Sequence, residues 1–141
     1  MSEMKWAIIT GADGGMGTEI TRAVAKAGYR IIMACYHPKK AEVVRERLSK
    51  ETGNPDLEVM AIDLSSMQSV VAFANQILER NLPISLLMNN AGTMETGFHT
   101  TSEGFERTVS VNYMGPYLLT RKLIPLMVRG CLLYTSDAAD D

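Results

Sequence analysis

The chain has 141 residues, of which 46% are hydrophobic and 21% are charged, a composition typical of one globular domain and not of a disordered or fibrous protein. Its 14 lysines and arginines against 16 acidic residues give a net charge of −2, so no basic surface predicts nucleic acid or an anionic membrane as a partner. The chain starts without the features of a signal peptide and has no apolar run long enough to span a membrane, so we expect a cytoplasmic protein. Cys35 and Cys131 fit neither a disulfide framework nor a metal site.

Short apolar runs alternate with longer amphipathic stretches along the chain. The runs are rich in Ile, Leu and Met and predict β-strands at 6–10, 31–34, 59–62 and 84–88. Because these runs are apolar on both faces, they are typical of parallel strands that helices cover on both sides. The stretches between them carry apolar residues at helical spacing and predict helices at 17–27, 39–52 and 66–78. The alternation predicts an α/β fold with a parallel sheet.

The helix expected at 66–78 has a plausible N-cap in Ser65 or Ser66. A last helical stretch extends from about 102 to 128, and Ser102 could cap its start. We expect this stretch to be interrupted near Gly115-Pro116 and again at Pro125, because proline removes a backbone donor.

A glycine-rich turn follows the first predicted strand and leads into the first helix. Gly11 allows the chain to turn sharply, Gly15 allows close approach to a pyrophosphate, and Gly17 allows the helix to pack closely. The helix N-terminus then offers free N–H groups to phosphates. The turn lacks the lysine of the loop that binds ATP or GTP, so we expect a dinucleotide instead. The predicted binding residues here are Thr10, Gly11, Asp13, Gly14, Gly15, Met16 and Gly17.

Four segments, in order and at matching spacing, resemble motifs of the short-chain dehydrogenases/reductases. They are the turn at 10–17, Asp63-Leu64, Asn89-Asn90-Ala91-Gly92 and Asn112. The resemblance covers about residues 4–130. It implies that 1–130 form the N-terminal part of a single Rossmann-like domain, a doubly wound parallel sheet with strand order 3-2-1-4. It also implies hydride transfer between NAD(P) and a carbonyl or alcohol substrate.

The resemblance assigns roles to the later motifs. Asp63 would accept a hydrogen bond from the adenine amino group, with the Leu64 backbone beside it, although Asp63 could also cap the next helix. The cofactor ribose would be lined by Asn90, Ala91 and Gly92, whereas Asn89 would brace the sheet. Asn112 resembles the catalytic Asn of the family; alternatively, it only satisfies backbone groups near the Gly115-Pro116 irregularity.

The catalytic Ser, Tyr and Lys of the family, which follow a fifth strand, have no counterpart in this chain. Tyr36 and Lys40 have the Tyr-x-x-x-Lys spacing, but they follow the second strand and Pro38 separates them. Residues 131–141 resemble a translated sequencing-adapter stretch, so we interpret them as a non-native tail. We therefore expect this chain alone to be inactive. The alternative from another class is a non-catalytic dinucleotide-binding or sensor protein.

The cofactor preference depends on the end of the second strand. NAD-specific relatives carry an acid there, which this chain lacks. Tyr36 could stack on adenine, and Lys39 or Lys40 could reach a 2′-phosphate, whereas Asp13 would oppose one. We therefore favour NADP(H) over NAD(H). For the full-length protein the resemblance implies a small-molecule substrate and a homo-oligomer.

Overall fold

A four-stranded parallel sheet forms the centre of the molecule, for which the computed structural model describes residues 5–139. The strand order is β3-β2-β1-β4, which confirms the predicted α/β class and the order 3-2-1-4. The register places Trp6 beside Arg30 and Ile31 beside Leu57, so the carboxyl ends of all strands lie at one edge of the sheet. The strands are β1 (Trp6–Thr10), β2 (Arg30–Cys35), β3 (Leu57–Ala61) and β4 (Ile84–Met88).

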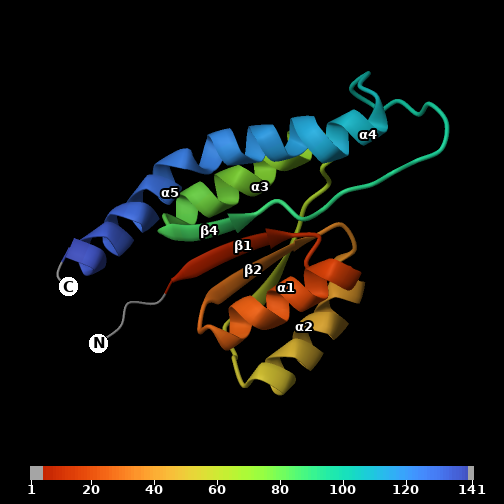
Figure 1. Cartoon of the computed structure of the whole chain (residues 1–141). Helices are drawn as coiled ribbons and strands as arrows, with labels where there is room; N and C mark the ends of the chain where they lie inside the picture. The colour runs from red at the N-terminus through yellow and green to blue at the C-terminus, as the bar shows by residue number, and fades with distance from the viewer. Residues whose placement is uncertain (1–4, 140–141) are drawn as a thin grey trace.

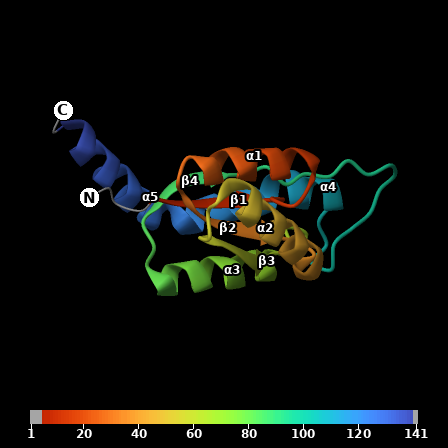
Figure 2. The ribbon, with the colours of Figure 1, turned by 90° about the horizontal axis from the view of Figure 1, so that it is seen from below.

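Helices cover both faces of this sheet (Figures 1 and 2). On one face lie α1 (Gly15–Lys26) and α2 (Pro38–Thr52), and on the other lie α3 (Met67–Arg80) and α5 (Gly115–Ala139). Alternate strand residues point to opposite faces. Ile8 and Ile32 therefore pack in one buried cluster with side chains of α3 and α5, whereas Ile9 and Ile31 pack in a second cluster with side chains of α1 and α2. The continuous apolar runs in the sequence have their physical reason in these two clusters.

The helix expected from Ser102 begins five residues later, at Arg107, so the prediction that Ser102 caps it is wrong. The segment before it folds back instead, because Thr100 and Glu106 form an isolated antiparallel bridge. The Glu106 carboxylate is the N-cap and accepts hydrogen bonds from the backbone N–H groups of Thr108 and Val109. A short α4 (Arg107–Val109) then leads into a π-helical turn (Ser110–Met114) and α5.

The break expected at Pro125 is also wrong, because α5 continues through it. Pro125 lies on the exposed side of the helix, as does Arg121, whose carbonyl loses its intrahelical partner. Solvent can satisfy that carbonyl, so the proline is tolerated. The expected irregularity near Gly115 is real, because the π-helical turn ends directly before that residue. The other predicted elements lie within two residues of their observed ends.

Helix α5 extends through residue 139 and so includes most of the segment interpreted as a non-native tail. The origin of that segment stays a prediction. Within residues 5–139, no helix combines the length and the apolar character needed to cross a bilayer.

Candidate functional site

A cavity of about 270 Å³ opens at the carboxyl edge of the sheet. In Figure 1 this edge faces the turn between β1 and α1 and the long loop that follows β4. Parallel α/β sheets bind ligands at this edge. Seven of the predicted residues line the cavity: Gly11, Asp13, Tyr36, Asp63, Leu64, Ala91 and Gly92. The other lining residues are Ala34, Ile62, Ser65, Thr93, Glu95, Arg107 and Val111.

The turn between β1 and α1 forms one wall of the cavity. Gly11 has a positive φ of 63°, which confirms the expected sharp turn, and a Cβ there would lie 2.9 Å from the Ala91 Cα. A Cβ on Gly17 would overlap the carbonyl oxygen of Gly11 and lie 2.9 Å from the amide nitrogen of Asn90. Position 17 therefore requires glycine, because the first turn of α1 packs directly against the glycine-rich turn and leaves no room for a side chain.

The N-terminus of α1 lies open beside this wall. Its N-cap residue is Gly14, which has no side chain to cap the first N–H groups. A Cβ on Gly15 would meet nothing within 4 Å, and the Met16 side chain is exposed. Thr10 is buried and does not line the cavity, and its hydroxyl accepts a hydrogen bond from the backbone N–H of Ala91 at 3.1 Å.

The segment after β3 forms the opposite wall. Asp63 Oδ1 accepts hydrogen bonds from the backbone N–H of Ser65 at 2.9 Å and from its hydroxyl at 2.6 Å. The N-cap of α3 is Ser66, whose hydroxyl accepts from the backbone N–H of Ser69. The prediction of a serine cap is therefore confirmed, whereas the alternative that Asp63 caps this helix is wrong.

The two asparagines after β4 hold the frame of the site. Asn89 donates from Nδ2 to the hydroxyl of Thr120 at 3.1 Å, which ties the end of β4 to α5 and not to the sheet. Asn90 donates from Nδ2 to the carbonyl of Gly11 at 3.2 Å, so it braces the glycine turn and does not line the cavity.

Asn112 lies in the π-helical turn and holds the loop after β4. Its Oδ1 accepts from the backbone N–H of Thr93 at 2.8 Å, and its Nδ2 donates to the Thr93 carbonyl at 2.7 Å. The side chain thus satisfies backbone groups, as the structural alternative proposed, although these groups belong to the loop and not to the nearby helix. Its catalytic role stays a prediction.

An ion pair that the sequence did not suggest also lines the cavity. Arg107 Nε lies 3.5 Å from Glu95 Oε1, and both side chains are partly exposed. Arg107 is the one cationic residue among those that line the cavity, which also include three carboxylates, Asp13, Asp63 and Glu95. No local sequence signal marks Arg107, because only the folding back of 100–106 brings it to the cavity.

The end of β2 forms the outer rim. The Tyr36 ring is exposed and packs edge-to-face against His37, with ring centroids 4.5 Å apart.

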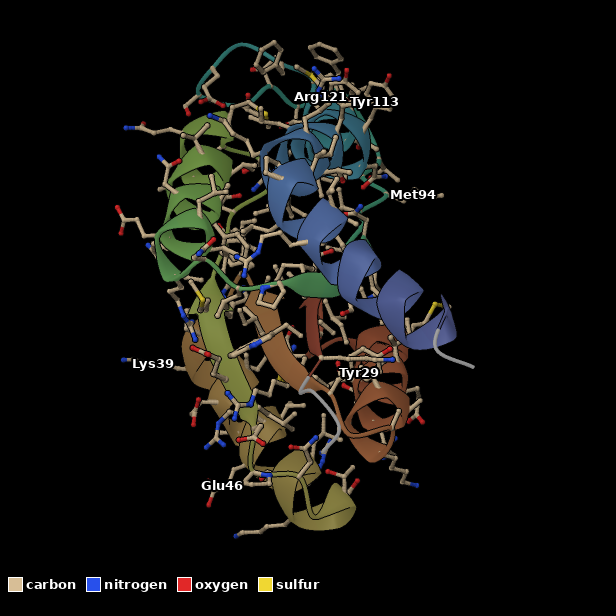
Figure 3. All side chains as sticks on the ribbon, turned by 90° about the vertical axis from the view of Figure 1, so that its left-hand side faces the viewer. Tyr29, Lys39, Glu46, Met94, Tyr113 and Arg121 are labelled. Atoms are coloured by element: carbon tan, nitrogen blue, oxygen red, sulfur yellow. The ribbon has the colours of Figure 1, made fainter. Side chains whose placement is uncertain are left out.

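Burial, and secondarily the nearby Asp13 carboxylate, raises the pKa of the Cys35 thiol to about 12. Cys35 therefore stays a neutral core residue at physiological pH. Lys39 lies at the start of α2 and points away from the protein (Figure 3).

Comparison with known proteins agrees with this arrangement. The profile of the family described as short chain dehydrogenase matches residues 5–132. The chain belongs to this family. Among curated relatives, human retinol dehydrogenase 11 is 37% identical over 120 residues, which are 85% of this chain and 38% of that protein. Human dehydrogenase/reductase SDR family member 13 is 36% identical over 121 residues, which are 86% of this chain and 32% of that protein.

Solved structures of the family share the fold. A metagenomic short-chain oxidoreductase in complex with NADP aligns with a TM-score of 0.76 and 28% identity, over 88% of this chain and 57% of that chain. An alcohol dehydrogenase from the archaeon Thermococcus sibiricus, complexed with 5-hydroxy-NADP, aligns with a TM-score of 0.77 and 28% identity, over 91% and 55%. This chain thus spans less than two-fifths of the length of the curated relatives described above.

Proposed function

We propose that this chain is the cofactor-binding part of an NAD(P)-dependent oxidoreductase that transfers a hydride between the nicotinamide and a carbonyl or alcohol carbon. The observation that carries the proposal is the cavity at the carboxyl edge of the sheet, where Gly11, Asp63 and Gly92 meet beside the start of α1. Membership of a family of oxidoreductases supports the reaction type.

The residues present fit a dinucleotide. The uncapped start of α1 and the open space at Gly15 suit a pyrophosphate, because helix N-termini bind anions. The cavity beside it offers the Asp63 carboxylate to a base and the small residues Ala91 and Gly92 to a ribose. When bound, the nicotinamide supplies the hydride chemistry. The residues of this chain bind and orient the cofactor, and Asn112 holds the loop that forms one side of the cavity.

We infer a preference for NADP(H). Several structural relatives are described as complexes with NADP or an analogue, β2 ends without an acid, and Lys39 and Lys40 lie at the start of α2. We expect NADP⁺ to bind about tenfold more tightly than NAD⁺, a difference of about 1.4 kcal/mol in binding free energy, as measured by calorimetric titration of the chain. Changing Lys39 and Lys40 to glutamine should remove most of this preference, because each long side chain can turn toward the 2′-phosphate and act on it as a point charge.

The control is Lys50→Gln, at the opposite end of the same helix, which should leave the preference unchanged. A tenfold preference of the parent chain for NAD⁺ would show that the inferred cofactor is wrong.

We propose that the 141 residues bind the cofactor without turning over substrate. General acid–base groups contribute about 10²- to 10⁴-fold to such reactions, and the family's Tyr and Lys have no counterpart here. With a panel of aldehydes and ketones, absorbance at 340 nm should show no NADPH oxidation above the enzyme-free rate. Steady turnover would contradict this proposal. If the gene sequence that follows Gly130 also lacks Ser and Tyr-x-x-x-Lys, we infer a non-catalytic dinucleotide-binding or sensor protein in place of the enzyme.

For the longer protein we propose a cytoplasmic location, a small-molecule substrate and a homo-oligomeric state. Exposed apolar side chains along α4, the π-helical turn and α5 support the homo-oligomeric state. They include Val109, Tyr113, Tyr117, Ile124 and Val128. The rings of Tyr113 and Tyr117 stack on the outer surface with centroids 6.3 Å apart, and Figure 3 labels Tyr113 there.

A further inference from the structure

The carboxylate of Asp63 is held by one neighbour through one of its two oxygens. Both donors of Ser65, the backbone N–H and the hydroxyl, point at Oδ1 at 2.9 and 2.6 Å. Within residues 5–139, Oδ2 accepts no hydrogen bond. Ser65 therefore fixes the rotation of the carboxylate and leaves Oδ2 as the oxygen available to a ligand.

The position of Ser65 is itself fixed by the surrounding structure. It lies between Asp63, whose backbone N–H donates to the Ser69 hydroxyl at 2.9 Å, and Ser66, the N-cap of α3. The carbonyl of Leu64 accepts from the buried Ser110 hydroxyl at 3.1 Å. The backbone of the Asp63–Ser65 turn is thus anchored to α3 and to the π-helical turn, so it cannot move without breaking several bonds, and the Ser65 donors keep their place beside the carboxylate.

The cavity around Asp63 offers acceptors to a ligand. Its lining includes three carboxylates, Asp13, Asp63 and Glu95, and its one cation, Arg107, is already paired with Glu95. A carboxylate oxygen accepts hydrogen bonds and cannot donate them. These acceptors favour a purine that carries an exocyclic amine, because the amine donates to a carboxylate. A purine with a carbonyl oxygen at the same position places a second acceptor against the carboxylate and leaves both oxygens unpaired.

We propose that Ser65 is a positioning residue that makes this cavity select adenine against oxo-purines, by holding the plane of the Asp63 carboxylate so that its second oxygen faces the base. The inference rests on the proposed dinucleotide-binding function. In this role Ser65 acts through Asp63 and does not need to touch the base. Its replacement should change the ratio of the affinities for an adenine and an oxo-purine dinucleotide, which a purely structural role would not produce.

The test compares NAD⁺ with nicotinamide hypoxanthine dinucleotide, which carries a carbonyl oxygen in place of the adenine amine. Calorimetric titration of the 141-residue chain should give a preference for NAD⁺ of roughly tenfold or more, the value of one well-placed hydrogen bond. Ser65→Ala should reduce the preference to about threefold or less, because the carboxylate loses the hydroxyl bond and keeps only the bond from the backbone N–H, so its plane is held less firmly. Ser65→Thr keeps the hydroxyl and should restore the preference.

A second variant keeps the inference testable if Ser65→Ala does not fold. In Asp63→Asn, the two donors of Ser65 should still require the side-chain oxygen as their acceptor, so the amide NH₂ must face the base. This variant should reverse the preference in favour of the hypoxanthine dinucleotide, because the amide donates to its carbonyl.

The outcomes separate the two proposals. Unchanged preference in Ser65→Ala, or a continued preference for NAD⁺ in Asp63→Asn, would overturn the role of Ser65 and leave dinucleotide binding intact. Failure of the parent chain to bind either dinucleotide would overturn both.

Discussion

Replacing Gly17 with valine is expected to abolish dinucleotide binding by the 141-residue chain. The first side-chain carbon would overlap the carbonyl oxygen of Gly11 and approach the Asn90 amide, which braces the same turn. Because these atoms belong to backbone or to an anchored side chain, the turn must move away from α1. That movement disrupts the wall of the cavity and the start of the helix together. Calorimetric titration with NADP⁺ should detect no binding at concentrations that saturate the parent chain.

Ala23→Val is the matched control for this variant. Ala23 lies on the exposed side of α1, so the same kind of side chain is added to the same helix without meeting the turn. It should bind NADP⁺ like the parent chain. If the Gly17 variant is folded by circular dichroism and binds equally well, the assignment of this turn to the cofactor is wrong.

Phe73→Ala is expected to reduce the free energy of unfolding by about 3–5 kcal/mol, which is a large part of the stability of an ordinary domain. Phe73 lies on α3, is 1% exposed, and packs in the buried cluster that also contains Leu119 and Leu123 of α5. Truncation removes its buried area and leaves a cavity between the two helices and the sheet. Urea unfolding of the chain, followed by circular dichroism, measures the loss.

Phe98→Ala removes the same atoms from a side chain that is 76% exposed. It should change the free energy of unfolding by no more than about 0.5 kcal/mol. Equal effects of the two substitutions would contradict the packing of α3 and α5 described here.

The features that could be predicted from the sequence are those encoded within a few residues or within a family motif. The strands at Trp6–Thr10 and Ile84–Met88 have the predicted ends, because each is a short and nearly continuous apolar run. The sharp turn at Gly11 follows from its glycine, and the sheet order follows from the family resemblance.

The segment after β4 could not be predicted in the same way. Its helical pattern begins at Ser102, but pairing of Thr100 with Glu106 delays the helix, and Glu103 turns to α3, where its carboxylate accepts from the backbone N–H of Met67 at 2.7 Å. These contacts join distant segments and leave no local periodic signal. Because these contacts also bring Arg107 to the cavity, the local sequence does not predict its position there.

Asn90 illustrates the difference between a motif and the roles of its members. The Asn90 side chain donates to the Gly11 carbonyl, 79 residues away in the sequence, and its place at a ribose stays a prediction. Ser65, in contrast, lies beside a motif residue without belonging to the motif. Its hydroxyl donates to the Asp63 carboxylate, a contact that only the three-dimensional structure shows.

We propose that the carboxyl edge of this sheet binds a nicotinamide dinucleotide. The most direct test is a two-dimensional amide NMR titration of the isotope-labelled, assigned chain with NADP⁺. Saturable shifts should concentrate at Gly11–Gly17, 63–65 and 91–93, the segments that form the cavity and the start of α1. A second cavity of about 230 Å³, lined by Trp6, Arg30 and Asp56 among others, lies at the opposite edge and serves as the internal reference. No saturable shift, or shifts confined to that second cavity, would show that the carboxyl edge does not bind the cofactor.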